Sequence, residues 1–501
     1  MNGARRTRQT LQILALFFLS LLTVSAAASG EGLPLQPGTH RTEAFRTAPI
    51  FSDGMVLPSG RAVTVWGWGV AGEKVTVSIA RQQQTTSIAA DATWQVTLAA
   101  MQPAVDLTMS VASDSGAITF AHVAVAKIKP LLAGVCKQLV DPLATPETAA
   151  LFHNLKLYSR RNTLIGQQDP EVSTTEQSGE TDMHRTTGSD PAVWGSDFMH
   201  ITHKQNNGQK NWFHDAQAQI IRRASTAYDR GMVNIFCWHF HEPYEQKTFN
   251  AREMPAPFRQ KAFRSLLPGG ENHNWYKEKL QKIAEVVGAI RGQNGTLSPV
   301  IFRPFHEFDG DWFWWGKPYC SAQEFRDCWR FTVQYLRDDL QVHNLLYAFS
   351  PDCHFKSEQD YLERYPGDAY VDVVGFDDYS DFEGNRVGAV AKKLAIVSTY
   401  AKQHEKLAAL TEVGYRQQPP PTRLYTGSYG AAFADPKLEI AFLMFWRQGK
   451  QAKGESYFVA VPAAETADDF LKFAICPRPL FLSGVKNLYS IEAFGRMAAG
   501  Q

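Results

Sequence analysis

The chain has 501 residues, with 51 Lys and Arg against 50 Asp and Glu, and therefore a formal charge of +1. This balance excludes the basic surface typical of nucleic-acid-binding proteins, and the chain has no acidic tail. Hydrophobic residues make up 44% of the chain and charged residues 20%, which excludes a disordered polymer and allows a sizeable core. The length predicts about two to four domains, although one α/β barrel can take about 250 residues or more.

Residues 1–28 have the pattern of a secretory signal peptide. Three arginines precede an apolar run at residues 11–22, and small residues follow up to Ala28. A positive segment, a short apolar core and small residues before the cleavage point are the parts of such a signal. We expect cleavage near Ala28 and a secreted or periplasmic location. The alternative is an uncleaved anchor, although the apolar run is short for a bilayer crossing.

A small β-sandwich is predicted for residues 47–130, after a polar leader at residues 29–46 that contains Gly and Pro. Apolar and polar residues alternate with period two in short runs, which Gly, Asp and Ser clusters separate. This alternation is typical of an antiparallel sandwich, in which one face of each strand is buried. The alternating runs lie at residues 63–65, 75–79, 94–98 and 107–111.

From residue 145 to residue 495, apolar runs alternate with amphipathic helices, which indicates parallel strands joined by helices. One helix presents Leu280, Ile283 and Val287 on one face, and a later helix presents Val390, Leu394 and Val397. Ser321 begins a third helix with a capping box. No GxGxxG motif or P-loop follows a strand, so a (β/α)8 barrel is favoured over a nucleotide-binding fold. The predicted strands lie at residues 232–238, 299–305, 345–350, 371–376, 407–410 and 440–446.

Neither a disulfide framework nor a metal motif is indicated. The six cysteines allow 15 pairings, and their spacing selects none of them. No CxxC motif or Cys/His cluster is present, and Asp309, Asp311 and Asp352 lack EF-hand spacing. We therefore expect no metal and no cofactor.

Polar side chains follow the predicted strands at the points where the strands end. Because the active site of a (β/α)8 barrel lies at the carboxyl ends of its strands, we expect these side chains to converge. Any one of them is more readily explained as a loop salt bridge, but that explanation is hard to sustain for all of them together. They are Asp197, His239, His306 with Glu307, Asp377 with Tyr379, Glu412 and Arg447.

The densest stretch is RPFHEFDGDWFWWG at residues 303–316, where Glu307 lies beside a histidine and a tryptophan-rich loop. Aromatic faces stack on sugar rings, and a carboxylic acid protonates a glycosidic oxygen. Apolar surroundings raise the pKa of such an acid and keep it protonated. Glu412, in LTEVGY at residues 410–415, supplies a second carboxylate. The pair favours glycoside hydrolysis.

These two stretches resemble signature segments of glycoside hydrolase family 26, whose best-known members are β-mannanases. The resemblance covers about residues 145–495 and extends to TLIGQQD (163–169), TTGSDPAVWGSDF (186–198), CWHFHEP (237–243), LLPGG (266–270) and VVGFDDY (373–379). It implies a (β/α)8 barrel, retention of configuration, and catalytic glutamates after strands 4 and 7.

Carried over to the matching positions, the resemblance implies that Glu307 is the acid/base and Glu412 the nucleophile. The other implied site residues contact the sugar or hold the nucleophile. They are His306 at the catalytic subsite, Trp312 as an aromatic wall, Asp377 and Tyr379 beside the nucleophile and the −1 sugar, His239 lining the site, and Trp446 and Arg447 at the end of strand 8. Glu242 departs from the family pattern, which bears on the shape of the negative subsites.

The N-terminal segment has a resemblance of its own. Residues 50–57, 65–68 and 72–75 are similar to the leading β-domain of sialate O-acetylesterases. The serine motif of the esterase core that follows that domain is not present in this sequence. We therefore expect an accessory sandwich without chemistry of its own, acting as a spacer or a weak carbohydrate-binding module.

Together these patterns predict a retaining endo-β-1,4-mannanase whose partner is a polysaccharide such as mannan, glucomannan or galactomannan. We expect no nucleic acid and, after signal cleavage, no membrane as a partner. One alternative is a glycosidase of the same fold that acts on β-1,3-xylan or mixed-linkage β-glucan, and another is a catalytically silent glycan-binding protein. The presence of both Glu307 and Glu412 argues against the silent protein, because binding alone does not need both acids.

Overall fold

The computed structural model describes residues 45–490, apart from residues 49, 50, 52, 172–179, 452, 453, 457 and 487. The predicted signal peptide and nearly all of the predicted leader lie outside these residues. Within the described part of the chain, no helix combines the length and the apolar character that a membrane crossing needs.

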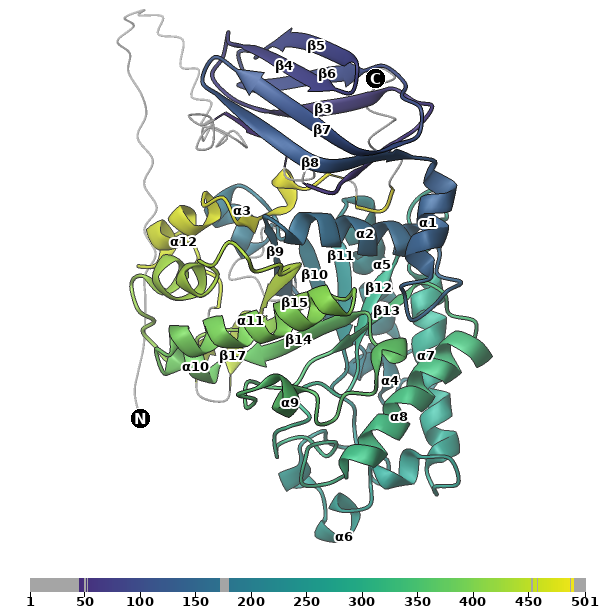
Figure 1. The fold of residues 1–501 in the computed structure, drawn as a ribbon. Helices are drawn as coiled ribbons and strands as arrows, with labels where there is room; N and C mark the ends of the chain where they lie inside the picture. The colour runs from purple at the N-terminus through teal and green to yellow at the C-terminus, as the bar shows by residue number, and fades with distance from the viewer. Residues whose placement is uncertain are drawn as a thin grey trace, which may run out of the picture. The chain divides into compact units, whose positions relative to one another are not determined.

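Two β-sheets form the N-terminal sandwich that the period-two alternation predicts (Figure 1). Its strands are β1 (Arg46–Thr47), β2 (Val56–Pro58), β3 (Val63–Trp68), β4 (Lys74–Ile79), β5 (Gln82–Ser87), β6 (Thr93–Leu98), β7 (Ala104–Ser113) and β8 (Gly116–Ala126). One sheet has the order β1-β3-β6 and the other β2-β8-β7-β4-β5. Alternate side chains of β4, such as Val75 and Val77, are fully buried. One pair differs from the antiparallel pattern, because β2 runs parallel to β8.

Eight parallel strands close into a barrel, which confirms the predicted (β/α)8 fold (Figure 1). They are β9 (Thr163–Gln168), β10 (Val193–Asp197), β11 (Val233–Cys237), β12 (Val300–Arg303), β13 (Leu345–Phe349), β14 (Val373–Asp378), β15 (Leu407–Val413) and β16 (Phe442–Phe445). Each strand pairs with the next, and β16 pairs with β9 to close the sheet. A short strand, β19 (Pro479–Leu480), also pairs with the beginning of β9, and β17 (Gly449–Gln451) forms a hairpin with β18 (Gly454–Ser456).

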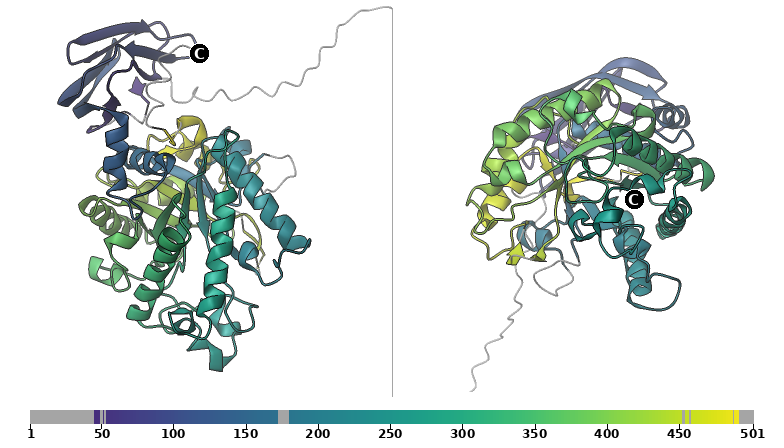
Figure 2. Two further views of the ribbon diagram at one scale, coloured as in Figure 1. Left: turned by 90° about the vertical axis from the view of Figure 1, so that its right-hand side faces the viewer. Right: turned by 90° about the horizontal axis from the view of Figure 1, so that it is seen from below.

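Helices lie outside the barrel strands, as two further views make clear (Figure 2). They are α1 (Ile128–Cys136), α2 (Pro146–Ser159), α3 (Asp182–Thr187), α4 (Met199–Thr202), α5 (Trp212–Asp229), α6 (Ala256–Arg259), α7 (His273–Ala289), α8 (Ala322–Gln334), α9 (Glu358–Tyr361), α10 (Ser380–Glu383), α11 (Val387–Gln403) and α12 (Ala467–Ala474). The predicted apolar faces of α7 and α11 are buried, and α8 begins at the predicted capping box of Ser321 and Glu324. All six cysteines are free thiols.

Candidate active site

Two buried carboxylates lie side by side at the carboxyl ends of β14 and β15. Asp377 and Glu412 are register partners, and the pairing shifts by one residue between Phe376 and Asp377. Such bulges re-aim side chains and are frequent beside active sites. The Asp377 side chain is fully buried and Glu412 is 5% exposed. The strand register therefore brings together two predicted site residues.

One guanidinium, that of Arg303 at the end of β12, pairs with both carboxylates. Its Nη1 donates to Asp377 Oδ2 at 2.7 Å and to Ser350 Oγ at 3.1 Å, and its Nη2 donates to Glu412 Oε1. Arg303 is itself 2% exposed. Because unpaired buried charges are very costly, the three ionic groups depend on one another. Sequence reasoning assigned no role to Arg303, although a charged residue ending an otherwise apolar strand was a usable signal.

Glu412 accepts hydrogen bonds on both carboxylate oxygens. Tyr379, directly after β14, donates its hydroxyl to Oε2 at 3.0 Å, opposite the oxygen that Arg303 binds. The Thr411 hydroxyl donates to Asp377 Oδ1 at 2.6 Å. Donors on both oxygens stabilise the negative carboxylate, which is the form that acts as a nucleophile.

Glu307 is held in an unusual backbone conformation four residues beyond β12. Its φ of 52° lies in the left-handed region, which costs about 1–3 kcal/mol for a non-glycine residue and persists only where the surroundings enforce it. Its N–H donates to the Ser350 carbonyl at 2.9 Å, and its own carbonyl accepts from the Gly310 N–H at 3.1 Å. These bonds fix where the predicted acid/base points.

The surroundings of Glu307 favour its protonated form. Burial, followed by the nearby charges of Asp377, Glu412 and Asp352, raises the pKa of Glu307 well above its ordinary value. The Trp312 indole donates to Glu307 Oε2 at 2.6 Å and opposes this shift only partly. A carboxylic acid kept protonated near neutral pH can donate a proton.

The tryptophan-rich loop contributes one aromatic side chain beside the acid rather than several. Trp314 and Trp315 are fully buried and Phe313 is 6% exposed, so these rings belong to the core. Trp312 is partly exposed and contacts Glu307. The expectation of stacking surfaces throughout the loop is therefore limited to Trp312.

His306, which directly precedes Glu307 in the chain, is a buried, uncharged imidazole. It is 1% exposed, and its carbonyl accepts from Trp315 Nε1 at 2.8 Å. Burial, followed by the positive charges of Arg303 and His239, lowers the pKa of His306 well below its usual value. A neutral imidazole has one nitrogen that donates and one that accepts, which suits contact with a sugar hydroxyl.

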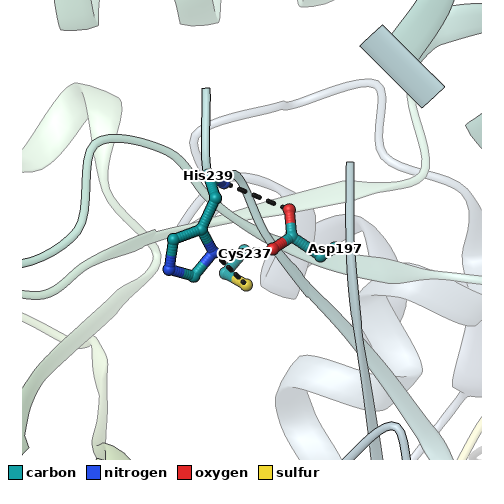
Figure 3. A group of neighbouring side chains, drawn as sticks. All are labelled: Asp197, Cys237 and His239. Atoms are coloured by element: carbon teal, nitrogen blue, oxygen red, sulfur yellow. Dashed lines mark hydrogen bonds and ion pairs between the residues drawn. The ribbon is translucent and has the colours of Figure 1, made fainter. Parts of the chain in front are cut away.

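His239 is oriented by Asp197, the last residue of β10 (Figure 3). Its Nδ1 lies 2.6 Å from Asp197 Oδ2, and its backbone N–H donates to Asp197 Oδ1 at 3.1 Å. A carboxylate at Nδ1 selects the tautomer that carries its proton there and leaves Nε2 on the other side of the ring as an acceptor. The ring centroid lies 4.6 Å from that of His306, so His239 adjoins another predicted site residue.

Trp446 and Arg447 follow β16 and lie next to β9 and β11. The Trp446 ring centroid is 5.7 Å from that of His239. Arg447 Nη1 is 3.9 Å from Asp169 Oδ2, directly after β9, and burial raises the pKa of Asp169 to about 6 although Arg447 opposes the shift. Asp169 also interacts electrostatically with Asp197, so the Arg447 pair adjoins the His239 side of the site.

Glu242 turns toward its own loop. Its side chain is 1% exposed and accepts from the backbone N–H groups of Tyr244, Glu245 and Lys247 at 2.7–3.1 Å. Buried carboxylates are stable when backbone donors satisfy them. The Glu242 carboxylate therefore shapes the loop after β11.

Close groups of acidic, His or Cys side chains exist among the described residues, two of them in this site. In one group Arg303 pairs with Asp377 and Glu412, and in the other Asp197 is bonded to His239. These carboxylates thus already have ion-pair or hydrogen-bond partners from the protein itself. The absence of a metal and of a cofactor stays a prediction.

Comparison with known proteins places this barrel among glycosidases. The family described as glycosyl hydrolase family 26 matches residues 140–417. The solved structure of GH26C from Muricauda sp. MAR_2010_75 has a TM-score of 0.69 and 43% identity, and the alignment covers 72% of this chain and 98% of that one. A GH26 β-mannanase from Bacteroides ovatus has a TM-score of 0.62 and 30% identity, with 69% and 98% covered.

A curated relative from Bifidobacterium adolescentis is named mannan endo-1,4-beta-mannosidase. It is 38% identical over 287 residues, which make up 55% of this chain and 27% of the relative. The chain therefore spans about a quarter of that protein's length. The family match begins at residue 140, after the sandwich, so the resemblance of the sandwich to sialate O-acetylesterases stays a prediction.

Proposed function

Because the chain belongs to glycoside hydrolase family 26, we propose that it is a retaining endo-β-1,4-mannanase. The geometry of Glu307 and Glu412 carries the proposal. Glu307, Glu412 and Asp377 each place one carboxylate oxygen within 4.8 Å of the other two. Retaining glycosidases hold their two carboxyl groups about 5–5.5 Å apart, whereas inverting ones need about 6.5–9.5 Å to admit a water.

The different surroundings of the two acids divide the work of a double displacement. Glu412, which Arg303 and Tyr379 hold as a carboxylate, attacks the anomeric carbon. Glu307 gives its proton to the departing glycosidic oxygen. In the second step Glu307 takes a proton from water, and the resulting hydroxide displaces Glu412 from the anomeric carbon.

The remaining residues position the sugar in this proposal. His306 contacts the mannose at the catalytic subsite, Trp312 forms the wall beside Glu307, and Asp377 supports Glu412 through their shared guanidinium. His239, Trp446 and Arg447 extend the contact surface toward β9 and β11. The partner is a mannan, glucomannan or galactomannan chain, and we propose that the protein acts outside the cytoplasm after cleavage near residue 28.

The decisive variant is Glu307→Ala, tested on polymeric mannan and on an activated aryl β-mannoside. Turnover of mannan should fall about 10²–10⁴-fold, because proton donation to a poor leaving group is lost. The activated substrate needs no such proton, so the glycosyl-enzyme should still form and accumulate. Azide, which needs no general base, should then restore turnover and yield the β-glycosyl azide.

Two further variants serve as controls for this experiment. Glu412→Ala removes the covalent step, so an aryl leaving group should not rescue it. Glu363→Ala removes a surface glutamate that pairs with Lys317 and should behave as the parent protein does. Near-normal activity of Glu307→Ala on mannan would contradict the assignment of the acid.

A same-fold β-glucanase is the alternative that one comparison favours. Endoglucanase H of Acetivibrio thermocellus is 30% identical over 174 residues, which are 34% of this chain and 16% of that protein. Product profiling on mannan, glucomannan, xylan and lichenan separates the two. We expect mannan and glucomannan to be cleaved fastest, and faster release of products from lichenan or xylan would overturn the proposed substrate.

A further inference from the structure

We propose that the protein has a further sugar-binding subsite, away from the scissile bond, whose stacking surface is Trp212. The inference rests on the proposed function, because its occupant is the same uncharged β-1,4-linked polysaccharide chain, continuing beyond the catalytic residues. An aromatic band leads from the catalytic centre to this tryptophan. The band consists of His239, Phe249, His241, His203, Phe213 and Trp212, all of them at least partly exposed.

The first half of the aromatic band begins at His239. The ring centroid of His239 lies 4.9 Å from that of Phe249, which lies 6.1 Å from that of His241 in a stacked arrangement. His241 contacts His203 edge to face at 5.2 Å. These rings come from the loop after β11 and from the end of α4. Both segments follow the carboxyl ends of barrel strands, where the substrate binds.

The second half reaches the surface at the beginning of α5. His203 stacks on Phe213 with centroids 3.9 Å apart and planes 5° apart, and Phe213 contacts Trp212 at 5.0 Å. Trp212 is 61% exposed. An exposed tryptophan at the end of a continuous band of rings is a binding surface rather than a packing residue, because burial contributes little of its stability.

The first turn of α5, which carries Trp212, is held in place by neighbouring side chains. Asn211 caps α5 by accepting from the N–H groups of Phe213 and His214 at 2.9 and 3.1 Å. Its side-chain amide donates to the Gln205 carbonyl at 2.7 Å. His200 contacts the Trp212 ring edge to face at 4.9 Å. A stacking surface that is fixed before binding loses little conformational entropy when a ligand arrives.

The chemistry of the aromatic band fits a neutral sugar chain. Burial lowers the pKa of His241 to about 4 and also lowers the pKa of His203. At neutral pH these imidazoles are therefore uncharged, and they offer donors and acceptors to hydroxyl groups between the flat faces. The uncharged imidazoles supply no attraction for an anionic polymer, whereas stacking and hydrogen bonding suit an uncharged polysaccharide.

The test compares Trp212→Ala and Trp212→Phe with Leu143→Ala as the matched control. Leu143 is another large exposed apolar residue. It lies near Asp141, which is bonded to His343 just before β13 begins. Leu143 is therefore at the amino ends of the strands, the end of the barrel opposite to the proposed site. The assay measures kcat/KM on galactomannan and on β-1,4-mannooligosaccharides of increasing length. Affinity electrophoresis in gels containing galactomannan measures binding directly, with each substitution placed in a Glu412→Gln background that cannot turn over.

Trp212→Ala should lower the ratio of kcat/KM on the polymer to that on the shortest hydrolysed oligosaccharide by about 2- to 12-fold, the usual range for one aromatic pair. Retardation in the gel should fall with it, and Trp212→Phe should restore part of both. Leu143→Ala should change neither. An unchanged ratio and unchanged retardation in a folded Trp212→Ala protein would overturn the inference, as would an equal loss on all substrate lengths.

Failure of the proposed function leaves a different result. If the parent protein releases no products from any mannan, the proposed substrate is wrong. Gel retardation by galactomannan, glucomannan and lichenan then tests the proposed subsite independently of catalysis, because binding requires no turnover. Loss of retardation in Trp212→Ala on any of these polymers supports the subsite, and no retardation of the parent by any of them overturns it.

Discussion

Replacing Arg303 with methionine should destabilise the protein by an amount that depends on pH. The guanidinium is the cation bonded to both Asp377 and Glu412, and all three groups are almost fully buried. Removing one partner of a buried ionic group costs about 3–5 kcal/mol, because the charges left behind have no compensation. We therefore expect a loss of about 3–5 kcal/mol in the free energy of unfolding at pH 8.

The sign of the pH dependence follows from proton binding. Burial already raises the pKa of Asp377 well above its ordinary value in the parent, and the charge of Arg303 opposes this shift. Without Arg303 the pKa of Asp377 will rise further above the unfolded value of about 4, so the folded variant takes up a proton. The folded variant then binds more protons than the unfolded one, and its stability falls as pH rises through that interval. The difference between parent and variant should be small near pH 4 and grow toward pH 8.

Urea denaturation at several pH values measures this difference, and Arg364→Met is the matched control. Arg364 is also buried, at 4% exposure, but it donates to the carbonyls of Lys317, Cys320 and Ser321 and to the Cys320 sulfur. Its loss should cost stability without the same pH slope. An equal cost of Arg303→Met at pH 4.5 and pH 8 would refute the reasoning, as would the same slope for both variants.

Four other changes have defined outcomes. Tyr379→Phe removes a hydrogen bond to the buried Glu412 carboxylate and should lower kcat about 10- to 100-fold and the free energy of unfolding by about 1–3 kcal/mol. Asp197→Asn removes the carboxylate at His239 Nδ1 and should reduce kcat/KM about tenfold or more, with a shifted pH profile. Glu242→Ala leaves three backbone donors without their acceptor and should lower the free energy of unfolding in urea by about 2 kcal/mol. Activity of the parent should decline as pH rises through the elevated pKa of Glu307, because the acid must be protonated, and a flat profile up to pH 10 would contradict this role.

The barrel could be predicted because its signals are local. Each apolar run fell on a strand, and the period of the apolar residues identified α7 and α11. The positions after the strand ends could then be listed from the sequence. No residue pattern predicts that β16 pairs with β9, because these strands are far apart in the chain. The closure was expected only because alternating strands and helices of this number commonly form a closed (β/α)8 barrel.

The partners within the site could not be predicted, because they depend on contacts between distant segments. Arg303 is 74 residues from Asp377 and 109 residues from Glu412, and only the order of the strands brings them together. The left-handed backbone at Glu307 leaves no mark on a sequence that has no glycine there. Glu242 is different, because the backbone N–H groups that donate to its carboxylate lie only two to five residues further along the chain. A local turn was therefore a possible interpretation of the sequence.

The shared guanidinium has a consequence for the catalytic cycle as a whole. In the resting site Arg303 faces two carboxylates, and in the proposed mechanism Glu412 becomes a neutral ester once it bonds to the sugar. Asp377 does not react in this mechanism, so it still provides a counter-ion for the buried cation in the proposed covalent intermediate. The negative charge that Glu412 gives up reappears on Glu307, which has donated its proton, so the net charge of the site is the same before and after the first step. Neither half of the proposed reaction has to move an ion through the interior.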